Sequence, residues 1–148
     1  MTRFAPYLIR PAAPTDLGAV GALLAAASLP REGVAEHFHS FLVAELDGVI
    51  IGAMGLELYR ETALLRSAVI APERRNAGIG SQLFTKALAL ARAERVQRLL
   101  LLTDTAGPYF AAKGFRAIDP ATVTGPVTGS FEFSGACPSH ALCMEMLL

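Results

Sequence analysis

Hydrophobic positions change their spacing along the chain, and each spacing predicts a different element. Residues 7–9 form a short apolar run that ends before a proline, which is typical of an edge strand. Capping side chains at Thr15 and Asp16 precede apolar residues that share one helical face, which predicts a helix to about Ser28. A short second helix is predicted over Glu32–Phe38.

Strand-like runs replace the helical spacing after residue 40 and predict an antiparallel unit. The segments Phe41–Leu46 and Val49–Tyr59 flank Asp47-Gly48, which supplies the positive φ angles of a two-residue hairpin turn. The connection Arg60-Glu61-Thr62 leads to a third strand, Ala63–Ile70. These strands are apolar on both faces, so helices should cover both faces of the sheet.

The next segments predict a parallel crossover. A polar stretch, Pro72–Ala77, leads into Gly78-Ile79-Gly80 and a helix that should run to about Glu94. Four consecutive leucines, Leu99–Leu102, fit a fully buried strand. Strand, glycine loop, helix and strand form a βαβ unit, whose two strands should be parallel.

The C-terminal third predicts smaller elements. A short helix is expected from about Gly107 to Lys113, followed by a strand that starts at Phe115–Ile118. Residues 125–135 are rich in Gly, Ser and Thr and predict a loop, and Ala141–Leu147 should close the sheet. No repeat or linker divides the chain, so we expect a single α/β domain over residues 1–148.

Composition narrows the function classes. Of the 148 residues, 53% are hydrophobic and 18% are charged, which excludes a disordered chain. The formal net charge of +0 gives no bulk attraction for nucleic acid. The apolar stretch Leu17–Leu29 is too short to span a bilayer and lacks the basic flank of a secretory signal. We therefore expect a cytoplasmic protein with neither a nucleic-acid partner nor a membrane partner.

The segment with the most chemical information is Pro72–Ser81. It opens a helix, where unpaired N–H groups and the helix dipole favour an anion, and its glycines allow a ligand close to the backbone. Lys follows neither glycine, which excludes a P-loop, and Leu83 stands where a Rossmann fingerprint needs glycine. The remaining pattern, R-x-x-G-x-G, indicates a phosphate or pyrophosphate site; the alternative is a tight turn without a ligand.

Residues 69–80 resemble the acetyl-CoA signature of the GNAT superfamily of N-acetyltransferases, and residues 109–115 resemble its later helix that ends in Gly-Phe. The resemblance implies a mixed, mostly antiparallel sheet that splays between strands 63–70 and 99–102 and holds acetyl-CoA there as co-substrate. The implied cofactor-binding residues are Val69, Ile70, Ala71, Arg74, Arg75, Asn76, Ala77, Gly78, Ile79, Gly80, Ser81 and Phe110.

The same resemblance implies a reaction and a partner. Acetyl would pass by direct attack to the primary amine of a small amino-acid-like molecule, and a homodimer is one option for the assembly. Residues 64–67 and 133–144 look like a small bacterial branch often associated with arsenic-resistance operons. Two alternatives stay open: a non-catalytic CoA-binding or regulatory module, and a thiol-based arsenical-binding protein.

Acetyl transfer needs a base for the amine and benefits from a proton donor for the thiolate. Related enzymes often place a Tyr at the position of Phe110, so Tyr109 is either a displaced acid or a packing residue. They also often carry a carboxylate where this chain has Leu64. Glu57 is the remaining candidate on the preceding strand, either as a base acting through water or as a solvated residue near a strand end.

Three further groups are candidates for the substrate site. Arg66 lies in an apolar strand and either binds a substrate anion or pairs with Glu57 or Glu45. Cys137 and Cys143 are either packing thiols or ligands of trivalent arsenic, and Cys137 is the candidate that would contact substrate. The three histidines lack the spacing of metal ligands, so we expect no metal site.

Overall fold

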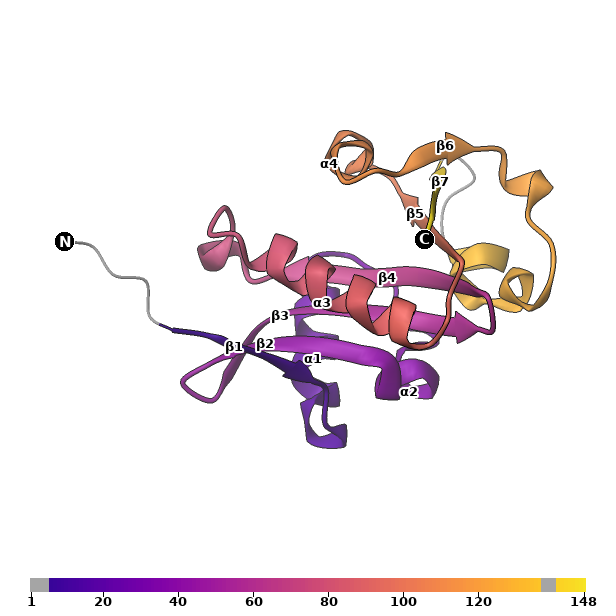
Figure 1. The fold of residues 1–148 in the computed structure, drawn as a ribbon. Helices are drawn as coiled ribbons and strands as arrows, with labels where there is room; N and C mark the ends of the chain where they lie inside the picture. The colour runs from indigo at the N-terminus through magenta and orange to yellow at the C-terminus, as the bar shows by residue number, and fades with distance from the viewer. Residues whose placement is uncertain (1–5, 137–140) are drawn as a thin grey trace.

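The computed structural model describes residues 6–136 and 141–148 of the chain. Seven strands form one sheet in the order β1-β2-β3-β4-β5-β7-β6 (Figure 1). Neighbouring strands are antiparallel except for β4 and β5, which are parallel. The strands are β1 (Leu8–Pro11), β2 (Phe41–Leu46), β3 (Val49–Tyr59), β4 (Thr62–Ile70), β5 (Arg98–Thr103), β6 (Arg116–Ile118) and β7 (Leu142–Leu147).

Helices cover both faces of the sheet, as its two apolar faces predicted. Figure 1 shows α3 (Ile79–Ala93) in front of β3 and β4 and α1 (Leu17–Ala26) behind them. The buried residues of α3 and of α4 (Gly107–Ala112) belong to one core cluster. Those of α1 and α2 (Val34–His37) belong to a second cluster. Among the described residues, no helix is long and apolar enough to cross a membrane.

The predicted hairpin turn is confirmed, because Asp47 and Gly48 have φ angles of 49° and 79°. Two predictions for the C-terminal part were wrong. The strand β7 does not close the sheet at its edge; it lies between β5 and β6. The expected loop contains short helical turns over Pro126–Gly129 and Glu132–Ala136. Val127 within it is buried against the sheet, an apolar contact that the Gly/Ser/Thr composition concealed.

The parallel pair β4–β5 separates soon after it begins. The two strands pair only from Thr62–Leu64 to Arg98–Leu100. Further along β4, the stretch from Arg66 to Val69 contains one residue more than the facing stretch of β3, and Ser67 there has a φ of 58°. Such a bulge bends its strand and increases the local twist. The splay that the resemblance implied is therefore present.

Glu145 of β7 forms ion pairs with the two neighbouring strands, β5 and β6. Its carboxylate is 4% exposed. One oxygen accepts a hydrogen bond of 2.6 Å from Arg116 Nη2 on β6, and the other accepts one of 2.6 Å from Arg98 Nε on β5. The hydrogen bond from Arg116 lowers the pKa of Glu145 more than its burial raises it, and Arg98 lowers it further.

We expect Glu145→Gln to reduce the free energy of unfolding at pH 7 by about 1–2 kcal/mol, because a charged buried hydrogen-bond partner is lost while exposed Arg116 remains screened by water. A lowered pKa gives stability that is present above the ordinary value of 4.5 and is lost as the pH falls. The difference between the variant and wild type should therefore shrink towards pH 3 in urea titrations. Exposed Glu94→Gln is the control, and indistinguishable curves for Glu145→Gln and wild type at pH 7 would refute this role.

Candidate active site

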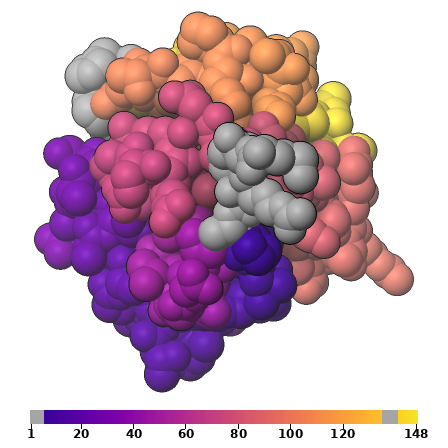
Figure 2. All heavy atoms as spheres, turned by 90° about the vertical axis from the view of Figure 1, so that its left-hand side faces the viewer, coloured from indigo at the N-terminus to yellow at the C-terminus, as the bar shows by residue number. Residues whose placement is uncertain are grey.

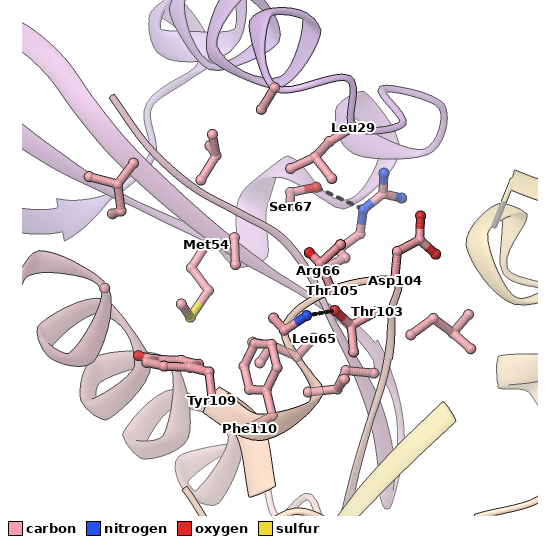
Figure 3. A pocket seen from close by; sticks show the side chains of 18 of the residues that line it. Leu29, Met54, Leu65, Arg66, Ser67, Thr103, Asp104, Thr105, Tyr109 and Phe110 are labelled. Atoms are coloured by element: carbon pink, nitrogen blue, oxygen red, sulfur yellow. Dashed lines mark hydrogen bonds between the residues drawn. The ribbon is translucent and has the colours of Figure 1, made fainter. Parts of the chain in front are cut away.

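A cavity of about 1450 Å³ follows the separation of β4 and β5. One end is lined by the segment that leads into α3, the other by the α1–α2 connection together with Glu132. Figure 3 shows Tyr109 and Phe110 on one side of this cavity, and Arg66, Asp104 and Leu29 on the other. The cavity therefore connects the predicted phosphate loop to the opposite side of the sheet.

The loop before α3 presents unpaired backbone donors to this cavity. Asn76 and Gly78 have φ angles of 64° and 83°, and these left-handed conformations turn the chain into the helix. No described residue accepts a hydrogen bond from the N–H groups of residues 76–81. Figure 2 shows this face of the molecule, where the pink segment lies between the indigo-to-magenta N-terminal half and the orange C-terminal part. Free amides at the start of a 15-residue helix, beside Arg74 and Arg75, suit a pyrophosphate.

All but two of the predicted cofactor residues line the cavity; the exceptions are Ala71 and Ala77. The N–H of Ala71 donates to the C=O of Ile51 on β3 at 2.8 Å, so it is already committed within the sheet. Backbone groups alternate in direction along a strand, which turns those of Ile70 away from β3 and towards the wedge. The N–H of Ile70 is therefore better placed than that of Ala71 to reach a ligand in the wedge, and the cofactor contacts of both residues stay predictions.

Tyr109 and Phe110 take different roles in the site. Phe110 is 8% exposed and packs edge-on against Phe115. Tyr109 is 41% exposed, and its hydroxyl lies 3.4 Å from Ser81 Oγ, which also accepts a 2.9 Å hydrogen bond from Lys113 Nζ. The Tyr109 hydroxyl therefore faces the N-terminus of α3, and in Figure 3 it points away from Arg66.

Glu57 and Arg66 form a buried ion pair. Their exposed fractions are 0% and 3%, and Arg66 Nη1 donates to Glu57 Oε2 at 2.7 Å. The alternative of a solvated Glu57 was therefore wrong, and so was a pair between Arg66 and Glu45, because Glu45 binds Arg10. Arg66 Nε also donates to Ser67 Oγ at 3.0 Å, which links the pair to the bulge of β4 (Figure 3). Glu57 itself does not line the cavity.

The surroundings of Glu57 keep it ionised. Burial acts to raise its pKa, but the hydrogen bonds from the Tyr59 hydroxyl and the Arg66 guanidinium and the charge of nearby His37 outweigh burial and lower it. Burial and the hydrogen bond to Glu57 raise the pKa of Tyr59 to about 12. A low-pKa carboxylate with both oxygens engaged is suited to holding other groups in place rather than to taking a proton.

Comparison with known proteins identifies the family of the chain. The model of the acetyltransferase (GNAT) family matches residues 17–115. The chain belongs to the GNAT family. An uncharacterized N-acetyltransferase of Chlorobaculum tepidum is 30% identical over 122 residues, 79% of this chain and 74% of that protein. The amino-acid acetyltransferase of Aeromonas salmonicida is 33% identical over 91 residues, which are 60% of this chain and 21% of that enzyme.

Solved structures share the fold. The N-acetylglutamate synthase of Neisseria gonorrhoeae, complexed with coenzyme A and N-acetyl-glutamate, has a TM-score of 0.82 and 21% identity, covering 99% of this chain and 36% of the synthase. A Mycobacterium tuberculosis protein in complex with CoA has a TM-score of 0.81 and 24% identity, covering 95% of this chain and 99% of its own. The GNAT chain thus spans about a third of the synthase and about a fifth of the curated amino-acid acetyltransferase.

Sequence reasoning missed Glu132, a carboxylate at the cavity. Glu132 is 6% exposed, and its Oε1 lies 3.9 Å from Arg66 Nη2. It lies in the segment that was expected to be a loop. A charged residue between Phe131 and Phe133 is the signal that could have indicated partial burial. His37 was also missed as a neighbour of Glu57; its Nε2 lies 3.7 Å from Glu57 Oε1.

Only one of the two cysteines, Cys143, lies among the described residues. Cys143 is 1% exposed on β7, and burial raises its pKa, so it packs as a protonated thiol. Cys137, the candidate substrate contact, lies outside the described residues. Within the described ranges, no three His, Cys, Asp or Glu side chains gather into a metal-binding group.

Gly80→Ala tests the phosphate loop with a minimal change. An added Cβ would lie 3.7 Å from the Tyr109 hydroxyl and 4.0 Å from Ile70, so the protein has room for it, and a helical Gly→Ala change stabilises by about 0.5–1 kcal/mol. The methyl group would stand where a pyrophosphate approaches the backbone. We expect acetyl-CoA affinity to fall about tenfold in calorimetry, which corresponds to ~1.4 kcal/mol.

Gly78→Ala is the contrasting variant. Its Cβ would meet nothing within 4 Å, but the φ of 83° is strained for any side chain and costs roughly 1–2 kcal/mol of stability. If Gly80→Ala binds acetyl-CoA as tightly as wild type, residues 76–81 do not cradle the pyrophosphate.

Proposed function

We propose that this GNAT chain transfers acetyl from acetyl-CoA to the primary amine of a small amino-acid-like molecule by direct attack in a ternary complex. The observation that carries the proposal is the cavity itself. One continuous space has free helix amides and two arginines at one end, an open strand edge along its side and carboxylates at the other end. An anionic cofactor and a cationic acceptor would therefore enter from opposite sides.

The cofactor end fits acetyl-CoA in two respects. The amides of residues 76–81 and the charges of Arg74 and Arg75 suit the pyrophosphate. The N–H of Ile70 faces the wedge and suits an amide C=O of pantetheine, while the Ile70 C=O accepts a 3.4 Å hydrogen bond from Arg75 Nε. The Neisseria synthase and the mycobacterial protein were both solved with CoA, which supports the same ligand here.

The acceptor end favours a protonated amine. The carboxylates of Glu32, Asp104 and Glu132 line it, while the two arginines of the phosphate loop lie at the opposite end. The amino-acid acetyltransferases among the relatives support an amino-acid-like acceptor. The side chain of Arg66 is 0% exposed, so we assign it the structural role of holding Glu57 and Ser67 in place of the substrate-anion contact.

The reaction needs a neutral amine near the thioester and a route for the thiolate to gain a proton. We propose Tyr109 as a contact of the cofactor near Ser81 rather than as the main acid, because its hydroxyl faces the start of α3. We assign Glu57 a positioning role in place of the expected base acting through water, because Glu57 is 0% exposed and does not line the cavity.

The arsenic association rests on sequence resemblance and stays a prediction, as do the homodimer and the cytoplasmic location. One observation weakens the thiol-based alternative. Buried Cys143 has a raised pKa, whereas binding of trivalent arsenic by thiols requires accessible thiolates.

Release of free CoA thiol tests the proposed function. Acetyl-CoA should stabilise the protein by ~2.7 kcal/mol at 100 times its dissociation constant, whereas ATP should not. Thiol release should then depend on an added amine from a panel of L-amino acids, diamines and amine-bearing arsenicals. Tight acetyl-CoA binding without amine-dependent release would instead indicate a non-catalytic CoA-binding module.

Tyr109→Phe should lower kcat less than tenfold and raise the KM for acetyl-CoA. A well-placed general acid contributes about 10²–10⁴-fold, and the thiol of CoA is a fairly good leaving group without one. Steady-state kinetics with varied acetyl-CoA separate the two effects. A loss of kcat above a hundredfold with an unchanged KM would show that Tyr109 is the acid after all.

A further inference from the structure

A carboxylate at the acceptor end has no role in the account so far. We propose that Glu132 is the general base that removes a proton from the acceptor amine. The inference rests on the proposed function and adds the group that activates its acceptor. It starts from position: Glu132 lines the cavity with a side chain that is 7% exposed, whereas Glu57 does not line it and has a side chain that is 1% exposed.

The second step is that Arg66 lies close to two carboxylates, those of Glu57 and Glu132. Arg66 Nη1 binds Glu57 Oε2 at 2.7 Å, and its Nη2 lies 3.9 Å from Glu132 Oε1. Glu57 therefore takes the closer contact with the guanidinium, and Glu132 lies beyond hydrogen-bond distance of it. Among residues 6–136 and 141–148, no group donates a hydrogen bond to the Glu132 carboxylate. Glu132 keeps its lone pairs for a ligand in the cavity.

The third step is its proton affinity. Burial raises the pKa of Glu132 to about 7; Arg66 acts to lower it, and the charge of Glu57 raises it. A base whose pKa is near the working pH combines a high ionised fraction with a strong tendency to take a proton. Glu57, with its lowered pKa, lacks that tendency.

Several charged groups face this carboxylate or its neighbours. Arg66 comes from β4, and Glu57 comes from β3. Glu57 is in turn faced by Tyr59 of the same strand and by His37 of α2. Two further carboxylates, Glu32 and Asp104, line the same cavity. A pH profile assigned to Glu132 must therefore be tested by replacing Glu132 itself.

Protons and bonds balance in the proposed reaction. The ammonium of the acceptor gives one proton to Glu132, and the neutral amine attacks the thioester carbonyl carbon to form the C–N bond. Collapse of the tetrahedral adduct breaks the C–S bond, and the second nitrogen proton reaches the departing thiolate through water. Products are the amide, CoA thiol and one proton that Glu132 returns to solvent.

The experiment compares pH profiles of kcat/KM, using the most active amine of the panel. Wild type should show a rise with an apparent pKa near 7. Glu132→Gln should lose 10²–10⁴-fold in kcat and lose that rise, leaving only the rise at higher pH where the amine deprotonates unaided. Acetyl-CoA affinity and the melting temperature should stay near wild type. Exposed Glu61→Gln in the β3–β4 turn is the matched control and should leave the profile unchanged.

Three further measurements separate a base from a structural residue. Formate should partly restore the activity of Glu132→Ala but not that of Glu132→Gln, because only the smaller side chain leaves room for a free carboxylate. Glu132→Asp should keep the rise near pH 7 at reduced kcat, which covers the case that the other variants fold poorly. Glu57→Gln should shift the rise to lower pH, because Arg66 then loses its other partner and stabilises the Glu132 carboxylate.

An active Glu132→Gln with an unchanged profile would overturn the role of Glu132 and leave the proposed function intact. A profile whose rise disappears in Glu57→Gln but persists in Glu132→Gln would transfer the role to Glu57. A wild-type protein that binds acetyl-CoA and acetylates no amine would overturn the proposed function and, with it, the base.

Discussion

The separation of β4 and β5 is the constraint on which the site depends. Parallel strands normally continue their hydrogen bonds along their shared length, and unpaired backbone groups in a buried position cost free energy. Here the pairing covers Thr62–Leu64 and then ends, and one extra residue near Ser67 bends β4. The open strand edges that result need a partner with its own amide groups. A pantetheine chain offers such groups, so the geometry of the sheet itself selects the class of ligand.

A buried ion network stabilises the acceptor side of this opening. Glu57, Arg66 and Ser67 link β3 to the bulge of β4, and removing one member of a buried ion pair typically costs about 3–5 kcal/mol because its partner is left uncompensated. The same network brings a guanidinium within 3.9 Å of Glu132. The residues that link the two strands therefore also set the charge around Glu132.

Much of this architecture follows from local sequence signals. The spacing of apolar and turn residues predicts the hairpin with its turn at Asp47-Gly48. It also predicts helix α3 and the buried strand β5. The loop that leads into α3 also follows, because its glycines and arginines lie within a few residues of one another; its role as the pyrophosphate site stays a prediction. The N–H of Ala71 is committed to Ile51, a pairing that only the register of β3 and β4 reveals. The arsenic-related branch is not shown by the comparisons with known proteins.

The acceptor side resists prediction because it is assembled from distant segments. Glu57 and Arg66 are nine residues apart on two strands, and Glu132 joins them from a segment whose composition resembles a solvated loop. Its partial burial depends on Val127, which anchors that segment to the sheet. The order of β6 and β7 has the same origin, because the pairing of β7 with β5 is a long-range contact. Burial of a polar residue is set by such contacts and is invisible to local pattern.

Amide chemical-shift mapping during a titration with acetyl-CoA tests the central claim most directly. The account predicts that the largest ¹H–¹⁵N shifts fall on residues 76–81 and on Ile70. The amide of Ala71 should shift much less, because it donates to Ile51. Desulfo-CoA should reproduce the shifts of the phosphate loop, since it retains the pyrophosphate. Shifts that leave residues 76–81 unchanged while acetyl-CoA binds elsewhere on the chain would contradict the assignment of this cavity as the acetyl-CoA site.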